Sequence, residues 1–241
     1  MLRTFIKHNC FVKKAFLTLL LFFPGNLLFT NHLYDIILYT ILGCYMKAYI
    51  KGQIKKSYET KQKIYQDEAL LNTIEEVAKK CVALYRGDKK TILAGNGGSA
   101  ADAQHIAAEL VGRYGFDRPS IPSLALTTDT SNLTAIGNDY GYDQVFSRQL
   151  EGMGQEGDIF IGISTSGNSV NIIKAFESAK KKNIMTVALT GRDGGKMAQM
   201  ADIALIVPSE STPRIQESHI LIGHILCDII EKEIFSDGVE I

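Results

Sequence analysis

The stretch Asp158-Ile159-Phe160-Ile161-Gly162-Ile163-Ser164-Thr165-Ser166-Gly167-Asn168-Ser169 joins a short apolar run to a turn with four hydroxyl side chains. The run is typical of a buried strand, and a helical pattern over residues 170–182 follows the turn. Hydroxyls and backbone N–H groups at such a turn converge on the positive end of a helix. The stretch therefore predicts a phosphate-binding turn. Taken alone, an ordinary Gly/Ser loop with a helix N-cap is an equally good interpretation.

A second turn of the same kind lies upstream. The apolar run Thr91–Ala94 leads into Gly95-Asn96-Gly97-Gly98-Ser99, and a helical pattern opens at Ala100. Two such turns in one α/β chain indicate a sugar phosphate or a nucleotide held at the carboxyl edge of a parallel sheet.

The rest of the chain alternates between strand and helix patterns. Strands are expected at 91–94, 123–126, 158–163, 185–190 and 203–207. Helices are expected at 46–66, 68–85, 100–112, 130–137, 144–153, 169–182, 196–200 and 214–235. This alternation predicts an α/β fold of flavodoxin-like type: a three-layer αβα sandwich around a five-stranded parallel sheet, preceded by N-terminal helices. Residues 46–241 would form that domain, with an N-terminal helical hairpin.

Residues 1–45 differ from everything that follows. Two apolar runs, Ala15–Phe23 and Ile36–Tyr45, are each shorter than the roughly 20 residues that span a bilayer. Lys13 and Lys14 before the first run allow a signal peptide, but no small-residue cleavage site follows. We favour Met46 as the true start and residues 1–45 as a mis-assigned extension. A membrane-anchored form is the remaining alternative.

Composition narrows the class of protein. Lys plus Arg and Asp plus Glu both total 26, so net charge indicates neither a nucleic-acid nor a membrane partner. The cysteines are few, scattered and without CxxC spacing, which argues against a cysteine zinc site or a disulfide framework and suits a reducing cytoplasm. Cys227 is expected in the core, since its surroundings are apolar.

His105 and Glu109 lie four residues apart on the helix that follows the upstream turn. This spacing places both side chains on one helical face, within reach of a common ion or substrate. The alternative is a solvated surface pair. Because the flanking residues are nearly all apolar, we expect the carboxylate and the imidazole to be partly buried and to need partners.

The terminal helix contributes Gln216 and His224. A lone histidine in an apolar stretch is more often a core residue than a ligand. With His105 and Glu109, however, His224 would complete a set of two histidines and one carboxylate suited to zinc or another divalent ion. A continuous helix separates Gln216 from His224 by about 12 Å. Either the helix begins after Gln216, or the two residues serve sites shared between subunits.

Two further segments are expected to be irregular. Asn138-Asp139 is predicted in a loop, where its polar groups would bind sugar hydroxyls or simply form a turn. Thr190–Gly195 is interpreted as a structural strand-to-helix turn.

With these residues in place, the chain resembles the sugar isomerase (SIS) domain family, and within it the phosphoheptose isomerases. The resemblance covers residues 46–236, and the STSGNS turn alone would indicate only a phosphosugar-binding SIS domain. The motifs that carry it are GNGGSA at 95–100, AQHIAAELVGRY at 103–114, GNDYG at 137–141, GDIFIGISTSGNS at 157–169, ALTGRDGGKM at 188–197 and RIQESHILIGHILCDIIE at 214–231.

The resemblance implies a role for each matching residue. Phosphate would be held by Ser99, Ser164, Thr165, Ser166 and Ser169. The sugar site would be lined by Asn96, Gly97, Gly98, Glu109, Asn138, Asp139 and Gln216. One zinc ion per subunit would be bound by His105, Glu109, Gln216 and His224, with Glu109 and His224 as the acid/base pair. The family's homotetramers share sites between subunits.

The activity implied is the ketose–aldose isomerisation of D-sedoheptulose 7-phosphate to D-glycero-D-manno-heptose 7-phosphate, a cytoplasmic step of heptose and lipopolysaccharide synthesis. Two alternatives remain. One is a non-catalytic SIS protein that regulates replication initiation by binding DnaA, but such a protein lacks the residues matching Glu109 and His224. The other is an isomerase of another phosphosugar, such as arabinose 5-phosphate, which the AQHIAAEL and RIQE motifs disfavour.

Overall fold

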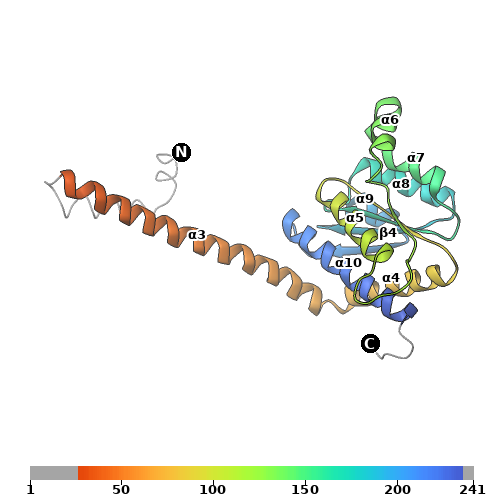
Figure 1. Ribbon diagram of the computed structural model, residues 1–241, viewed down its shortest axis with the longest axis horizontal. Coiled ribbons are helices and arrows are strands. Elements are labelled where there is room, and N and C mark those ends of the chain that lie inside the picture. Colours follow the sequence, from red (N-terminus) through yellow and green to blue (C-terminus); the bar gives the residue numbers. More distant parts are fainter. Residues whose placement is uncertain (1–26, 236–241) are drawn as a thin grey trace. The chain divides into compact units, whose positions relative to one another are not determined.

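The structure, a computed structural model, describes the backbone of residues 27–235 and the side chains of residues 45–235 (Figure 1). The run Ala15–Phe23 and the signal-peptide alternative therefore lie outside the described residues. The chain divides into two compact units, Met1–Lys56 and Ser57–Ile241.

In chain order the elements are α3 (Leu27–Gln66), α4 (Glu68–Arg86), β1 (Thr91–Gly95), α5 (Gly98–Val111), β2 (Ser123–Ala125), α6 (Thr130–Tyr140), the 3-10 turn η1 (Tyr142–Gln144), α7 (Val145–Met153), β3 (Ile159–Ser164), α8 (Val170–Lys181), β4 (Met185–Gly191), α9 (Gly195–Met200), β5 (Ile203–Val207) and α10 (Thr212–Phe235).

The sheet has the predicted five strands, all parallel, in the order β2-β1-β3-β4-β5. β1 pairs with β3 from Thr91 opposite Ile159 to Gly95 opposite Ile163. The order of the strands reverses direction between β1 and β3, which makes this pair the topological switch point of a doubly wound sheet. Ligands of such folds bind outside the carboxyl ends of the strands at that point.

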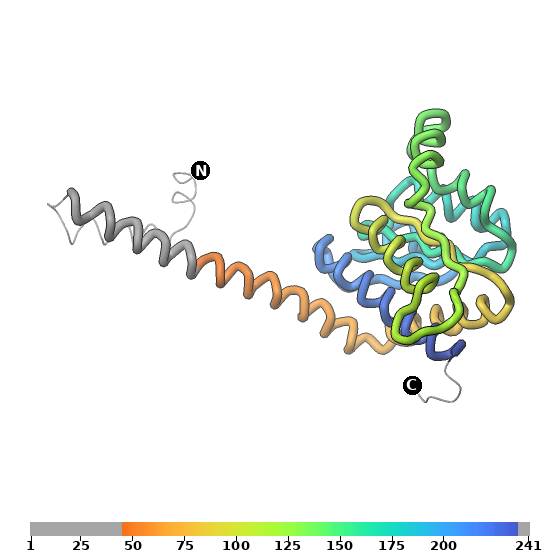
Figure 2. Tube along the Cα trace, viewed as in Figure 1, coloured from red at the N-terminus to blue at the C-terminus, as the bar shows by residue number. Residues whose placement is uncertain are grey.

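Helices cover both faces of the sheet, so the predicted three-layer sandwich is confirmed (Figure 2). One core contains buried residues of α4, α5 and α10, and the other contains those of α7, α8 and α9. Successive side chains of a strand point to opposite faces. Accordingly, Leu93 belongs to the first core, while Ile92 and Ala94 belong to the second.

α4 forms as its sequence predicts. The Asp67 carboxylate caps the helix by accepting the N–H of Leu70 at 3.0 Å. The apolar stripe of the helix is buried from Leu70 to Leu84. Cys227 on α10 is also buried, which confirms it as a core residue.

The helix expected to begin at Met46 begins at Leu27 instead. The reason is that residues 27–66 contain no proline, and Gly43 and Gly52 each cost a helix only about 1 kcal/mol. Among the described residues, no helix combines the length and the apolar character needed to cross a membrane.

α6 also differs from its prediction, because it continues three residues beyond Gly137. Asp129 caps its start by accepting the N–H of Asn132 at 3.0 Å. The helix ends at Gly141, whose φ of 87° favours glycine. The predicted loop at Asn138-Asp139 is therefore wrong, since both residues lie in the last turns of α6.

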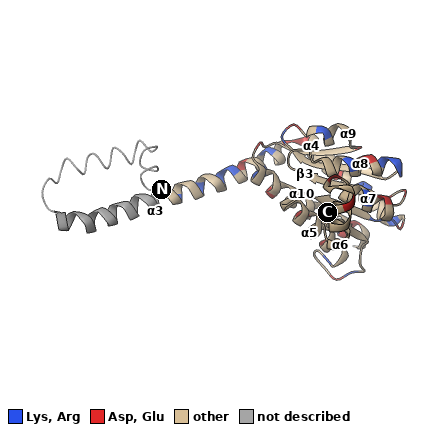
Figure 3. Cartoon of the chain, turned by 90° about the horizontal axis from the view of Figure 1, so that it is seen from above, with Lys and Arg blue, Asp and Glu red and all other residues tan. Residues whose placement is uncertain are grey.

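Acidic and basic residues both occur along the described ribbon (Figure 3), and in the full sequence they are equal in number. Charge of both signs on the same elements gives no long-range field of one sign.

His219 on α10 is fully buried against the end of β4. Its Nε2 lies 2.9 Å from the backbone oxygen of Thr190, so the neutral ring donates there. Burial lowers the pKa of His219 to about 4, and the bond to Thr190 opposes only part of that shift.

We expect the protein to lose stability as pH falls from about 6.5 to about 4. In the unfolded chain the histidine has a pKa near 6.5 and is protonated in this range, whereas in the folded chain His219 stays neutral. This difference should lower the free energy of unfolding by between about 2 and 3 kcal/mol. Urea unfolding at both ends of this range measures it. His219→Gln, which does not titrate, should show a shallower pH dependence, and equal slopes in the two proteins would contradict the assignment.

Candidate active site

Both predicted phosphate-type turns open at the switch point of the sheet. Gly95, the last residue of β1, pairs with Ile163, the next-to-last residue of β3. The turn Asn96–Gly97 leads from β1 into α5, and the turn Thr165–Ser169 leads from β3 into α8. The two turns therefore lie at the same edge of the sheet, as the sequence predicted.

The turn after β3 is held in a compact shape by its own hydroxyls and backbone. Ser164 Oγ and Ser169 Oγ are 2.9 Å apart, and the N–H of Gly167 donates to Ser164 O at 3.1 Å. Gly167 has a φ of 64°, a conformation that glycine adopts without strain. Thr165 and Ser166 lie between these contacts, next to the first turn of α8.

The turn after β4 supports this loop. The N–H of Met197 donates to Gly167 O at 2.9 Å, and the N–H of Lys196 donates to Asn168 Oδ1 at 3.2 Å. A Cβ at position 167 would collide with the backbone oxygen of Gly194. The interpretation of residues 190–195 as a structural turn is confirmed, and its role is to hold the loop after β3.

A pair of amides links the two turns. Asn96 and Asn171 exchange hydrogen bonds of 2.9 Å in both directions, and Tyr142 donates its hydroxyl to Asn96 Oδ1 at 3.2 Å. Asn171 is buried on α8, and sequence reasoning missed both it and Tyr142. The available signal was the position of Asn171, two residues after the phosphate-type turn and inside an otherwise apolar helical stripe.

α5 and α10 run parallel and close together. A Cβ on Gly98 would collide with the side-chain amide of Gln216, and one on Gly223 would lie 2.6 Å from Ile106 Cδ1. Gln216 therefore lies against the start of α5, beside Ser99, which is buried in its first turn. Because Gly223 has no side chain, α10 can approach α5 closely at Ile106, about one turn before α5 ends.

His105, Glu109 and His224 meet where these helices touch. Their ligand atoms all lie within 4.8 Å of one another. His105 Nε2 is 3.0 Å from both Glu109 Oε1 and His224 Nε2. A single N–H can serve only one of those two contacts, whereas a cation between the three atoms would satisfy all of them.

Two of the separations are close to those of ligand atoms around one metal ion. Ligand atoms about 2.0–2.1 Å from a tetrahedral zinc lie roughly 3.3 Å from one another, and both separations from His105 are 3.0 Å. Two imidazoles and one carboxylate are a ligand set found in catalytic zinc sites, which leave a position open. The structure thus provides a group of side chains able to hold a metal.

Gln216 lies apart from this cluster. α10 is continuous from Thr212 to Phe235, so the expectation that the helix might begin after Gln216 is wrong. Eight residues separate Gln216 from His224, about 12 Å along the axis. Within one chain, Gln216 faces the Asn96–Ser99 turn and not the ion position.

The expected burial is right for Glu109 and wrong for His105. The Glu109 side chain is 27% exposed, and that of His105 is 48% exposed. The apolar stripe of α5 that faces the sheet contains Ala103, Ile106, Ala107 and Leu110, and this leaves position 105 at the side of the helix.

Asp102, one turn before His105, was also missed. Burial raises the pKa of its carboxyl to about 6, while nearby His105 opposes the shift. Its Oδ2 is buried without a hydrogen-bond partner among residues 45–235. A carboxylate in the nearly apolar stretch 100–110 was the available signal.

Asn138 and Asp139 lie near the end of α6 and are exposed. Asn138 Nδ2 donates to Asp139 Oδ1 at 2.8 Å, so their polar groups are joined to each other. Their assignment to the sugar site stays a prediction.

Comparisons with known proteins agree with this geometry. A family profile described as "SIS domain" matches residues 55–191. The phosphoheptose isomerase of Sulfurimonas denitrificans is 86% identical over 194 residues, which are 80% of this chain and 100% of the relative. That of Aneurinibacillus thermoaerophilus is 63% identical over 190 residues, which are 79% of this chain and 96% of the relative.

Solved structures show the same likeness. The phosphoheptose isomerase GmhA from Neisseria gonorrhoeae has a TM-score of 0.73 and 45% identity, over 78% of this chain and 99% of that one. The chain therefore belongs to the SIS domain family and has its fold. Within that family it belongs with the phosphoheptose isomerases.

We expect Gly167→Ala to disrupt the loop after β3. The new Cβ would meet Gly194 O, and a φ of 64° strains an alanine, so the loss of stability should exceed about 2 kcal/mol. Urea unfolding measures the loss, and titration with inorganic phosphate should show weaker binding. Gly152→Ala in α7, where a Cβ meets nothing within 4 Å, is the matched control and should be neutral or slightly stabilising. Equal effects of the two substitutions would contradict the role of Gly167.

Proposed function

We propose that this chain is an aldose–ketose isomerase that converts D-sedoheptulose 7-phosphate to D-glycero-D-manno-heptose 7-phosphate. The observation that carries this conclusion is the meeting of one carboxylate and two imidazoles at the helix that follows a phosphate-type turn, in a chain 86% identical to a named phosphoheptose isomerase. The reaction is the first step of nucleotide-activated heptose synthesis, which supplies lipopolysaccharide.

The substrate phosphate binds at the carboxyl edge of the sheet. The groups that hold it are the hydroxyls of Ser99, Ser164, Thr165, Ser166 and Ser169, with the N–H groups that begin α8. The sugar part of the substrate is lined by Asn96, Gly97, Gly98, Asn138, Asp139 and Gln216. Binding the phosphate far from the reacting carbons uses binding energy to position the other end of the chain.

Glu109 is the general base. Its carboxylate removes a proton from the carbon next to the ketone and returns it to the neighbouring carbon, through an enediol. His224 moves a proton between the two oxygens, first as acid and then as base. The 3.0 Å contacts of His105 with Glu109 and His224 support these roles, because they hold the carboxylate and the second imidazole close together.

His105, Glu109 and His224 would hold a zinc ion. When bound, zinc supplies Lewis-acid polarisation of a carbonyl oxygen. Gln216 is proposed as a further ligand that acts across a subunit boundary, because the continuous α10 keeps it from the ion of its own chain.

A homotetramer in the cytoplasm is the proposed form of the protein. An exposed apolar stripe on α3 supports self-association: Met46, Ile50 and Ile54 recur every four residues, with Tyr49 beside them. Such a stripe is typical of a helix that packs against a partner.

We expect the full chain to convert sedoheptulose 7-phosphate to an aldose phosphate in a coupled assay. Activity should fall on treatment with a chelator and return with zinc, since the three ligand atoms would then lose their shared cation. If the chelator does not change the rate of conversion, the protein is an isomerase whose mechanism does not use the metal. A folded protein without conversion would contradict the proposed function.

We expect Glu109→Gln to lower kcat by about 10²- to 10⁴-fold, since the amide cannot accept the proton. Urea unfolding should change little, because the Glu109 side chain is part-exposed. Glu75→Gln is the matched control, since Glu75 also forms an i,i+4 pair, with Lys79 on α4, and its loss should leave kcat unchanged. Substantial activity in Glu109→Gln would remove Glu109 as the base.

A further inference from the structure

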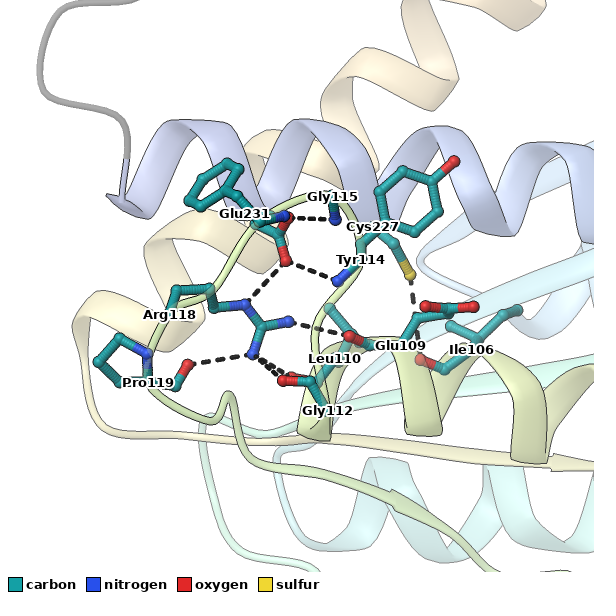
Figure 4. Close-up of polar contacts among 11 residues, drawn as sticks. Ile106, Glu109, Leu110, Gly112, Tyr114, Gly115, Arg118, Pro119, Cys227 and Glu231 are labelled. Carbon is teal, nitrogen blue, oxygen red and sulfur yellow. Dashed lines mark hydrogen bonds and ion pairs between the residues drawn. The ribbon is translucent and has the colours of Figure 1, made fainter.

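Arg118 and Glu231 form a buried ion pair outside the proposed ligand set. Arg118 Nε lies 2.9 Å from Glu231 Oε2, and their side chains are 1% and 2% exposed. Arg118 is in the segment after α5, and Glu231 is near the end of α10 (Figure 4). Buried charges persist only where further hydrogen bonds satisfy them, so the other partners of this pair are informative.

The Glu231 carboxylate binds three consecutive backbone N–H groups. Tyr114 donates to Oε2 at 2.8 Å, while Gly115 and Phe116 donate to Oε1 at 2.6 and 3.1 Å. Burial raises the pKa of Glu231, but these donors and Arg118 outweigh it and hold the pKa below its usual value. The ionised carboxylate therefore joins the segment 114–116 to α10.

The Arg118 guanidinium binds the end of α5. Nη2 donates to Glu109 O at 2.9 Å, and Nη1 donates to Leu110 O at 2.7 Å and to Gly112 O at 3.1 Å. The last carbonyls of a helix have no partner within it, and a cation there is favoured by the helix dipole. The ion pair thus connects the carboxyl end of α5 directly to α10.

This connection lies next to the proposed metal site. Glu109 is itself one of the residues whose carbonyl Arg118 binds. Glu231 follows His224 by seven residues, two helical turns. Tyr114, whose N–H binds Glu231, has its ring 5.8 Å from the ring of His224. Two of the three groups in the cluster, Glu109 and His224, are therefore bound by or next to residues that the pair holds.

We propose that Arg118 and Glu231 are positioning residues for the metal site: they hold α5 and α10 together so that His105, Glu109 and His224 converge. The inference rests on the metal site of the proposed function. Residues that orient metal ligands without touching the ion typically change affinity or activity by 10- to 100-fold when they are replaced.

Glu231→Gln tests the proposal, because it removes the charge and one acceptor at nearly constant volume. Asp158→Asn is the matched control. Asp158 is also a buried carboxylate, 1% exposed, which binds the ammonium of Lys90 at 2.7 Å and the N–H groups of Lys90 and Gln155. It lies just before β3, and its side-chain partners Lys90 and Gln155 belong to neither α5 nor α10.

Zinc affinity is the first measurement, by competition with a chromogenic chelator on the full chain. We expect Glu231→Gln to bind zinc about 10- to 100-fold more weakly than the unaltered protein, and Asp158→Asn to bind it equally well. In kinetic assays Glu231→Gln should lower kcat and leave the KM for the phosphosugar unchanged, since the phosphate loop lies on β3 and α8.

Each other outcome overturns the inference. Equal zinc affinity in Glu231→Gln and the unaltered protein would show that the pair does not position the ligands. An equal loss in Asp158→Asn would show general destabilisation. An unaltered protein that does not bind zinc would refute the metal site itself, a result distinct from the first two. If Glu231→Gln does not fold, Arg118→Lys is measured in the same way. It keeps the charge, loses the fork that binds Glu109 O and Leu110 O, and should weaken zinc binding likewise.

Discussion

The pairing of β1 with β3 in the middle of the sheet is the constraint on which the rest depends. Because the chain crosses from these strands to opposite faces, α5 packs in one core and α8 in the other. The turns that follow both strands therefore lie at the same edge of the sheet. Asn96 and Asn171 join the upstream turn to α8 by two reciprocal hydrogen bonds. The two phosphate-type turns lie side by side only because this pair of strands is adjacent.

The parallel contact of α5 with α10 decides which side chains of the two helices meet. Three close approaches to α10 occur in order along α5 and the segment after it: Gly98 with Gln216, Ile106 with Gly223, and Gly115 with Glu231. Gln216 lies at the start of α5, the cluster of His105, Glu109 and His224 follows, and the buried ion pair of Arg118 and Glu231 lies beyond the end of α5. One helix pair therefore carries the candidate ligands and the ion pair in that order.

The sequence predicted the elements well where local signals were strong. The strands at 91–95 and 159–164 are short apolar runs followed by glycine and hydroxyl residues, and both were correctly placed. The prediction of helix boundaries was wrong where a single residue was taken as the end or the start of a helix. Gly137 was read as the end of a helix that stops at Gly141, because a single glycine weakens a helix without ending it. The helix expected from Met46 begins at Leu27 for a similar reason, since no proline interrupts it.

The sequence by itself determined the fold class, the two turns at the strand ends and the pairing of His105 with Glu109. Strand alternation and i,i+4 spacing are local properties that a chain carries in its order of residues. Only the tertiary structure brought His224 to that pair, separated Gln216 from it, and placed Glu231 on the segment that follows α5. These contacts join residues more than a hundred positions apart. They depend on how closely two helices pack, which side-chain volumes across both helices decide together.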